Sequence, residues 1–426
     1  MSFGFNPRIS TWSPFHGAVY SVIEAAAKIA AAGGEYSSSR ATLQEYFEKL
    51  GKDKRKWGKP FGALLGAYYA LTELGIPAIG GKDSMSGSFE NLNVPPTLIT
   101  FAVDTIDVGK AISPEFKKAG SPVVYVKLSR DEHEMPDFAG LKKNYALITE
   151  KIRAGEILAA ASVRAGGLTE AISKMSFGNR LGFTFAEELT PEELVSPDYG
   201  SLVLEVDWET IANKTGEPAS AGKAGDAFGK RIARVFKGLD FTLIGTTKTE
   251  PVITIRSATA AGDNNIGQID ISIAEALSCW RKPLESIFPT RTTVRQDAVT
   301  QDIYSERSGK GPAQKVARPR VLIPAFPGTN CEYETGKAFA RAGAVVDTLV
   351  FRNLTTAHID ASLKMLRKKI DNSQIIVLPG GFSAGDEPEG SGKFIAAVFR
   401  NPVISEAVMR LLKDRDGLML GICNGF

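Results

Sequence analysis

Cysteine and histidine are scarce in this chain, whose 426 residues contain three of each. Cys279, Cys331 and Cys423 are too few and too far apart to form a disulfide framework, so we expect a reducing compartment, the cytoplasm. The sequence also has no closely spaced Cys/His cluster, which argues against a structural zinc site.

Long apolar runs are absent as well. No segment approaches the roughly 20 apolar residues of a membrane-spanning helix, and the N-terminal residues lack the basic and apolar regions of a signal peptide. The formal net charge is +3, and residues 289–320 hold seven Lys and Arg against three acids. Because Tyr304 is the only aromatic residue of that segment, it is typical of a solvated linker. We therefore expect neither nucleic acid nor a membrane as a partner.

The pattern of apolar residues and turn signals predicts a multidomain protein of the α/β and α+β classes. Residues 1–112 and 113–288 are expected to form two α+β subdomains, 289–318 a linker, and 319–426 a parallel sheet. In the first subdomain we expect helices over 15–33, about 40–50 and 60–75, a polar loop Gly80–Gly87, and a strand Thr97–Val103.

In the second subdomain the expected strands are Val123–Leu128, Ile157–Ala161, Leu181–Phe185, Leu202–Val206 and Val252–Ile255, and the expected helices are 143–153, 168–177 and 272–287. After the linker, strands and helices alternate. The expected strands are Val321–Phe326, Val345–Phe351, Ile375–Leu378 and a run that leads into Cys423, and the expected helices are 333–342, 359–369 and 391–413. Such alternation predicts a parallel sheet whose sites lie at the carboxyl ends of the strands.

The most informative motif is Gly421-Ile-Cys423-Asn-Gly425, which has the form of a nucleophile elbow. A sharp turn after a short apolar strand exposes one side chain at the sheet edge, and flanking glycines avoid Cβ clashes in that turn. A helix that follows the turn would favour the thiolate form of Cys423 through its positive N-terminal end. The sequence stops within the elbow, so we expect this chain to be a fragment.

A second turn supports this interpretation. Pro379-Gly-Gly381 follows another strand of the same sheet, and its N–H groups could face a developing oxyanion beside Cys423. Cys331 follows the first strand but lacks the elbow's glycine spacing, and Cys279 is most simply a core residue of its helix. His358 opens a helix, so we expect the general base of Cys423 to lie beyond residue 426.

In the first subdomain two features could bind a ligand. The Gly80–Gly87 segment offers Lys82, Asp83, Ser84 and Ser86 as polar groups around a backbone that could hold phosphate, although a simple polar turn explains the same residues. Glu24 lies four residues before Lys28 in an apolar helix, and a surface ion pair is the ordinary explanation of that spacing.

Taken together, these motifs resemble those of phosphoribosylformylglycinamidine synthases of the large single-chain form. The resemblance is carried by Ile79–Gly87, Phe326–Glu332, Leu378–Ser383 with Gly385-Asp386, and Gly421–Phe426, and it covers nearly the whole chain. It implies an ATP- and glutamine-dependent ligase that converts formylglycinamide ribonucleotide into its amidine in purine biosynthesis. This chain would span the second half of the synthetase region and the first part of the glutaminase domain, and the first synthetase half and the rest of the glutaminase domain would be missing partners.

The resemblance assigns roles to single residues. Cys423 would attack the amide of glutamine to give a thioester and ammonia, and Gly381 and Asn424 would supply the backbone donors of the oxyanion hole. Lys82, Asp83, Ser84 and Ser86 would be candidates for binding nucleotide or substrate. Without the triad partners we expect this chain alone to be inactive.

The synthetase part departs from the family pattern. Glu24 matches a magnesium-binding carboxylate, but Lys28 stands where better-known members have Asn, and Ser162 stands where an Asp ligand is expected. A Lys ammonium near a lost carboxylate can take the place of a cation. ATP and Mg²⁺ are therefore expected for the full enzyme, whereas this half is expected to be a pseudo-site.

Two other interpretations stay open at this point. The chain could be a stand-alone cysteine hydrolase or chaperone-like protein with the same elbow, or a non-catalytic assembly piece. We also expect an exposed apolar face on residues 1–110, where the missing synthetase half would pack.

Overall fold

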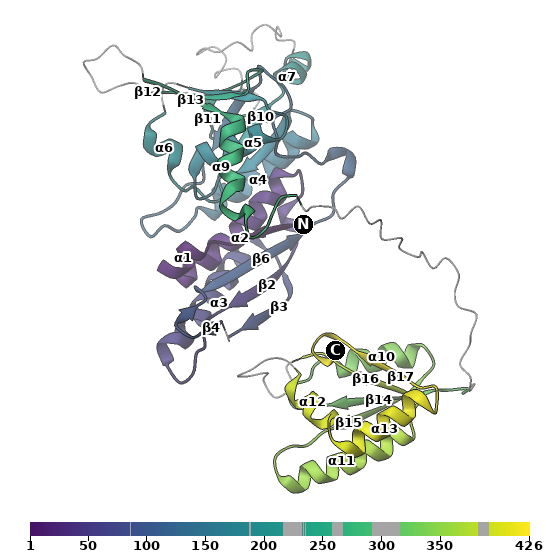
Figure 1. Ribbon diagram of the computed structural model, residues 1–426. Coiled ribbons are helices and arrows are strands. Elements are labelled where there is room, and N and C mark those ends of the chain that lie inside the picture. The colour runs from purple at the N-terminus through teal and green to yellow at the C-terminus, as the bar shows by residue number, and fades with distance from the viewer. Residues whose placement is uncertain are drawn as a thin grey trace. The chain divides into compact units, whose positions relative to one another are not determined.

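The computed structural model describes residues 1–85, 87–186, 189–215, 232, 234, 236–257, 267–291, 316–381 and 392–426 (Figure 1). The chain forms two compact units, Met1–Val294 and Arg295–Phe426. Within the described ranges, no helix has both the length and the apolar character needed to cross a membrane.

The first sheet of the first unit has four strands in the order β1-β6-β2-β3. Its strands are β1 (Ser2–Gly4), β2 (Arg40–Tyr46), β3 (Ala78–Ser84) and β6 (Thr97–Val103); only the β2–β3 pair is parallel. The other elements of this part are α1 (Pro7–Trp12), α2 (Pro14–Ala31), α3 (Lys54–Leu74), a small hairpin of β4 (Ser88–Phe89) and β5 (Leu92–Asn93), and the 3₁₀ turns Tyr36–Ser38 and Val108–Lys110.

Two sequence predictions for this part are wrong. The segment predicted as a helix over about 40–50 contains β2, because β6 and β3 hydrogen-bond to it on both sides. Its Ala, Leu, Gln and Glu residues favour a helix only as a weak local preference, which sheet pairing overrides. The predicted polar loop Gly80–Gly87 begins instead as the edge strand β3, where glycine is tolerated.

The helices α2 and α3 pack closely because small residues line their contact. An ideal Cβ placed on Gly66 of α3 would lie 2.1 Å from the carbonyl oxygen of Phe15 in α2, so only glycine permits this approach. α3 begins at Lys54, earlier than predicted, and Asp53 caps it by accepting a hydrogen bond from the N–H of Arg55. The helix ends at Gly75, which adopts the left-handed conformation predicted for that position.

The second sheet of the first unit has seven strands in the order β13-β12-β9-β11-β7-β10-β8. Its strands are β7 (Pro122–Val126), β8 (Ile157–Ser162), β9 (Gly182–Phe185), β10 (Leu202–Val206), β11 (Thr242–Lys248), β12 (Val252–Ser257) and β13 (Gly267–Ser272). Its helices are α4 (Phe138–Arg153), α5 (Gly167–Phe177), α6 (Pro191–Val195), α7 (Trp208–Thr215) and α9 (Ile273–Glu285). Because both faces of this sheet are covered, the interior strand β10, between β7 and β8, is buried along its whole length.

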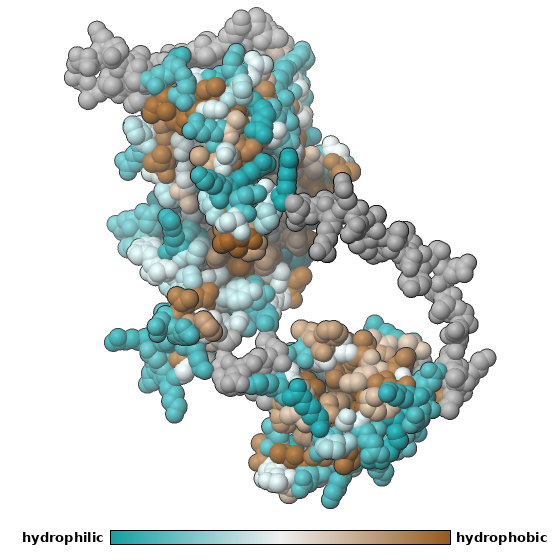
Figure 2. All heavy atoms as spheres, in the orientation of Figure 1, coloured by the Kyte–Doolittle hydropathy of each residue, from teal (hydrophilic) through white to brown (hydrophobic). Residues whose placement is uncertain are grey.

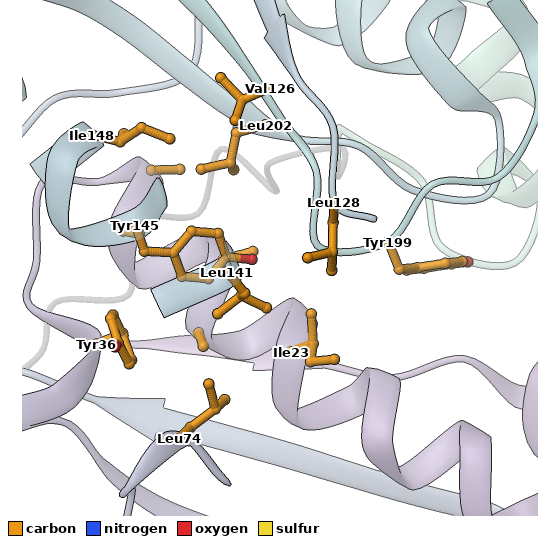
Figure 3. Packing of buried hydrophobic residues seen from close by; sticks show 14 of the residues in the cluster. Ile23, Tyr36, Leu74, Val126, Leu128, Leu141, Tyr145, Ile148, Tyr199 and Leu202 are labelled. Atoms are coloured by element: carbon orange, nitrogen blue, oxygen red, sulfur yellow. The ribbon is translucent and has the colours of Figure 1, made fainter. Parts of the chain in front are cut away.

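One hydrophobic cluster joins the two sheets of the first unit. Alternate residues of β10 face opposite sides: Leu202 and Leu204 belong to this cluster, whereas Val203 packs with α5 and α9. Figure 3 shows Ile23 of α2 and Leu74 of α3 gathered with residues of α4 and the seven-stranded sheet. The expected subdomains 1–112 and 113–288 therefore share a core.

The second unit is a parallel four-stranded sheet in the order β15-β14-β16-β17. Its elements are β14 (Arg320–Ala325), α10 (Glu332–Arg341), β15 (Val345–Val350), α11 (Thr356–Asp371), β16 (Ile375–Leu378), α12 (Lys393–Phe399), α13 (Pro402–Lys413), β17 (Leu418–Gly421) and the 3₁₀ turn Cys423–Gly425. Apolar clusters on both sheet faces confirm the predicted α/β class.

Several apolar side chains remain exposed. On α3 they recur at helical spacing, with Phe61, Leu64 and Tyr68 each more than half exposed, as expected for residues 1–110. In the second unit, Figure 2 shows apolar surface around the end of the chain, where Leu418 and Leu420 of the edge strand β17 are exposed.

Cys279 is also exposed, so the prediction that it is a core residue of its helix is wrong. The buried residues of α9 are Ile273 and Leu277.

A carboxyl pair lies between β2 and β3. Glu45 and Asp83 are register partners, so their side chains share one face of the sheet. Glu45 is only 5% exposed, and burial together with the Asp83 carboxylate raises the pKa of Glu45 to about 7. The folded protein therefore holds a proton here that the unfolded chain releases at lower pH.

The packing of α2 against α3 gives a first prediction. Gly66→Ala should lower the unfolding free energy by at least about 2 kcal/mol, because the new methyl group meets backbone that cannot move away. Gly62→Ala is the matched control in the same helix, since its Cβ would lie no closer than 3.9 Å to any neighbour. That control should be neutral or stabilising by up to ~1 kcal/mol through helix propensity. Urea unfolding followed by circular dichroism measures both, and equal midpoints would contradict the predicted packing.

The carboxyl pair gives a second prediction. The pKa of Glu45 is higher in the folded protein than in the unfolded chain. The stabilisation that Glu45 gives the folded protein is therefore fully present below the unfolded-state pKa and is lost as the pH rises through about 7. Stability should fall between about pH 5 and pH 8 by up to about 3 kcal/mol, and Glu45→Gln should flatten that fall. Urea unfolding midpoints, measured across this pH range by tryptophan fluorescence, test whether stability falls as the pH rises. If stability depends on pH as steeply in Glu45→Gln as in the unmodified chain, the raised pKa does not belong to Glu45.

Candidate functional site

Cys423 lies at the carboxyl end of β17, in the second unit. Its φ is +53°, a left-handed conformation that non-glycine residues rarely adopt and that is found at strained functional turns. The backbone closes a tight turn there, since the N–H of Gly425 donates to the carbonyl of Ile422 at 2.9 Å and that of Phe426 to the carbonyl of Cys423 at 3.0 Å. The side chain of Cys423 is exposed at this sheet edge.

The two glycines of the motif have the steric role that the sequence predicts. A Cβ on Gly421 would lie 2.5 Å from the carbonyl oxygen of Gly425, and one on Gly425 would lie 2.3 Å from that of Leu378. Both contacts are with backbone, so a side chain at either position would force the turn open. The glycines thus hold Cys423 against the end of β16.

The Gly380-Gly381 turn lies directly beside Cys423. A Cβ placed on Gly380 would be 3.3 Å from the Cβ of Cys423 and 3.9 Å from its Sγ. Gly381 has φ +103°, and the carbonyl of Gly380 accepts a hydrogen bond of 2.8 Å from the N–H of Asn330. The structure therefore brings the predicted nucleophile and turn together, with Asn424 in the 3₁₀ turn that follows the thiol. Phe382, Ser383, Gly385 and Asp386 lie outside the described residues.

The other residues considered for this chemistry lie elsewhere in the second unit. Cys331 is exposed at the start of α10 with φ +68°, next to the Asn330 that contacts the turn. His358 is in the first turn of α11, after the opposite edge strand β15. Three strand spacings separate β15 from β17, which amounts to ~14 Å. This distance agrees with the expectation that His358 is not the base of Cys423.

In the first unit, Glu24 of α2 is deeply buried, since only 1% of its side chain is exposed. Its Oε1 lies 2.8 Å from the Nζ of Lys28 and 2.8 Å from the Nε of Arg164, and its Oε2 accepts a hydrogen bond from the N–H of Phe5. The pair with Lys28 is therefore not an ordinary surface ion pair, because two cations neutralise a buried carboxylate.

These residues do not fit a magnesium ion. Lys28 also donates to the carbonyl of Phe3 at 2.7 Å, so its ammonium is held beside the carboxylate of Glu24. Burial lowers the pKa of Lys28, and Arg164 and Lys174 lower it further, so positive charge already crowds this position. Ser162 lines the adjoining cavity of about 340 Å³ and is not a carboxylate. Among the described residues no cluster of three His, Cys, Asp or Glu could hold a metal.

Most of the predicted nucleotide-binding group lies on β3. Lys82, Asp83 and Ser84 lie along this strand, and Lys82 and Asp83 both line a cavity of about 330 Å³ beside Trp57 and Phe61 of α3. Ser86 lies outside the described residues. The three described residues of this group thus belong to a strand and not to a loop.

Two residues of these sites were not predicted from the sequence. Arg164 lies two residues after Ser162, and no local pattern in the sequence pairs it with the distant Glu24. Glu45 lies in the segment predicted as a helix, so its approach to Asp83 was not foreseeable. If residues 40–46 are predicted as a strand, the pairing of Glu45 with Asp83 follows, because neighbouring parallel strands place their side chains in register.

Comparison with known proteins agrees with this geometry. Residues 318–426 match a family model described as a CobB/CobQ-like glutamine amidotransferase domain. Phosphoribosylformylglycinamidine synthase subunit PurQ of Methanococcus maripaludis (strain C5) is 37% identical over 108 residues, which are 25% of this chain and 36% of that protein. The chain thus spans only about a third of the length of that relative.

A longer relative covers most of the chain. The probable phosphoribosylformylglycinamidine synthase, chloroplastic/mitochondrial, of Arabidopsis thaliana is 23% identical over 413 residues, which are 86% of this chain and 27% of that protein. Among solved structures, T. maritima PurL complexed with ATP is similar with a TM-score of 0.46 and 16% identity, over 64% of this chain and 43% of that one. T. maritima PurL complexed with FGAR is similar with a TM-score of 0.45 and 14% identity, over 100% and 69%.

The sequence relatives of both parts carry the same family name, which the motifs predicted. Residues 318–426 match the glutamine amidotransferase model and the PurQ subunit, whereas the match to the plant enzyme extends across most of the chain. The chain is therefore similar to phosphoribosylformylglycinamidine synthases, and its residues 318–426 match a glutamine amidotransferase domain.

Proposed function

We propose that this chain is part of a glutamine-dependent amidoligase that converts formylglycinamide ribonucleotide to its amidine in purine biosynthesis. The names of the PurQ and plant relatives support the reaction, and the amidotransferase match supports glutamine as the source of nitrogen. Residues 1–112 and 113–288 would be the two subdomains of one synthetase half, 289–318 a linker, and 319–426 part of the glutaminase domain. The other synthetase half and the rest of the glutaminase domain would be its partners. The reaction would take place in the cytoplasm.

The observation that carries this proposal is the exposed thiol of Cys423, held in a left-handed turn against Gly380. Its thiolate would attack the side-chain carboxamide carbon of glutamine, forming a carbon–sulfur bond and placing negative charge on the oxygen. The backbone N–H groups of Gly381 and Asn424 would stabilise that oxyanion. Collapse of this intermediate would expel ammonia and leave a glutamyl thioester, which water would hydrolyse to glutamate.

ATP would activate the formyl amide oxygen of the substrate in the complete enzyme. Within the first unit, Lys82, Asp83, Ser84 and Ser86 are the candidates for binding nucleotide or substrate. Glu24 is not proposed to hold magnesium, because Lys28 and Arg164 already neutralise it. We propose instead that the α2–Arg164 region is a structural pseudo-site.

A second candidate function has two observations in its favour. A non-catalytic assembly piece would account for the neutralised Glu24 and for the apolar residues exposed on α3. A stand-alone cysteine hydrolase is less well supported, because the similarity to the plant enzyme extends far beyond the amidotransferase domain. Dependence of glutamine hydrolysis on an added synthetase half would favour the ligase over both.

The thiol chemistry gives a third prediction. No histidine or carboxylate among the described residues is hydrogen-bonded to Cys423, so the purified chain alone should hydrolyse glutamine at least about 100-fold more slowly than a complete amidotransferase. A glutamine-mimicking chloroketone should still label the chain at Cys423. Cys423→Ala should abolish this labelling, whereas Cys331→Ala, the matched control at the neighbouring exposed thiol, should retain it. Rapid hydrolysis, or labelling that survives in Cys423→Ala, would contradict the assignment.

The pseudo-site gives a fourth prediction. Calorimetric titration of the chain with ADP should show no magnesium-dependent binding, because Lys28 and Arg164 already neutralise Glu24. The double variant Lys28→Asn/Ser162→Asp removes this ammonium and adds a carboxylate, so it should gain magnesium-dependent binding by at least about tenfold. Ser162→Asp alone is the control, since the ammonium remains. Magnesium-dependent binding of ADP by the unmodified chain would show that the site is functional.

A further inference from the structure

A cavity of about 410 Å³ lies between α9 and the turn that leads into β9. Its basic residues come from two distant parts of the chain, since Arg180 belongs to the turn, whereas Arg281 and Lys282 belong to the end of α9. The ring of Trp280 in α9 lies 5.7 Å from that of Phe177 at the end of α5, so packing holds the helix beside the turn. Three basic side chains thus converge on one cavity.

These three cations are not neutralised by neighbouring acids. Within the part of the chain that the structure describes, Arg180, Arg281 and Lys282 form neither an ion pair nor a hydrogen bond through their side chains. The one carboxylate that lines the cavity belongs to Glu285, and its Oε1 accepts hydrogen bonds from the N–H of Thr290 at 3.0 Å and from its hydroxyl at 2.9 Å. Three cations against one carboxylate leave the cavity with a net charge of +2.

The turn that carries Arg180 is held in place. Arg180 has φ +59°, a left-handed conformation that is uncommon for arginine and that recurs at functional turns. The preceding Asn179 donates a hydrogen bond of 2.8 Å from its side-chain amide to the carbonyl of Phe116, which fixes the turn on the body of the first unit. Because like charges repel, cations gathered in this way favour an anion between them.

The cavity is suited to one ligand chemistry. A guanidinium group can donate two parallel hydrogen bonds to a phosphate group, and Arg180 and Arg281 supply two such groups. A phosphate monoester carries a charge of about −2 above its second pKa of about 6, which matches the net charge of the cavity, whereas a single carboxylate would neutralise only half of it. Leu277 and Ala274 of α9 add apolar surface for an organic group, and the volume fits a small molecule.

We propose that the cavity between α9 and the Arg180 turn binds a phosphate monoester of a small organic molecule. Arg180, Arg281 and Lys282 would hold the phosphate, and the organic part would cover Leu277. The site shares no residue with the Cys423 turn or with the cavity beside Glu24. Failure of this proposal would therefore leave the proposed ligase reaction intact.

The full chain can be titrated by calorimetry with n-butyl phosphate at about pH 8 and low ionic strength, where the ester carries both negative charges. We expect saturable binding to one site, with a dissociation constant of about 1 mM or lower. Inorganic phosphate should bind more weakly, because it has no organic part to cover Leu277. Arg180→Gln and Arg281→Gln should each weaken binding of the ester by about tenfold or more, since each removes one guanidinium group.

The matched control is Arg153→Gln, which removes an exposed arginine of the same unit that pairs with Glu35 and does not line the cavity. It should bind the ester as the unmodified chain does, and circular dichroism verifies that each variant is folded. Succinate provides a second dianion without phosphate. Affinity for succinate or inorganic phosphate equal to that for the ester would show an unselective anion site and contradict the assignment to a phosphate monoester. No saturable binding, or equal affinity in Arg180→Gln, Arg281→Gln and the unmodified chain, would overturn the site itself.

Discussion

The first unit depends on the neutralisation of one buried negative charge. Glu24 lies in the middle of α2, the helix that packs against α3, β6 and the seven-stranded sheet, and an unpaired carboxylate there would cost several kcal/mol. Lys28 supplies one cation from the same helix, and Arg164 supplies another from the segment after β8. The second pair joins the two halves of the unit, so the charge requirement of α2 also fixes the place of the Arg164 segment.

The same residues explain why a family resemblance does not transfer every role. An internal ammonium and a guanidinium satisfy Glu24 permanently, whereas a metal would do so only when bound. The elbow of the second unit has the opposite character: backbone contacts at Gly421 and Gly425 preserve the turn, and they leave the thiol of Cys423 exposed. The charge of Glu24 is thus neutralised by side chains, whereas the geometry of the Cys423 turn is held by its backbone.

Much of the second unit could be predicted from the sequence. Short apolar runs alternating with amphipathic segments specify a parallel sheet, and the strand Ile375–Leu378 has the predicted bounds. The glycine spacing around Cys423 likewise predicted a tight turn, because only glycine fits where backbone meets backbone. In the first unit, α2 and β6 were predictable for the same reason, since their apolar patterns are long and regular. The segment 40–50 was not, because its residues favour a helix locally.

The sequence by itself determined the class of fold, the family resemblance and the position of the candidate nucleophile, since spacing and side-chain chemistry are local properties. Only the tertiary structure decided which groups meet. It placed Gly380 against Cys423, set Arg164 on the carboxylate of Glu24, and aligned Glu45 with Asp83. These contacts join residues from distant parts of the chain. Their partners follow from strand register and helix packing, which no local pattern encodes.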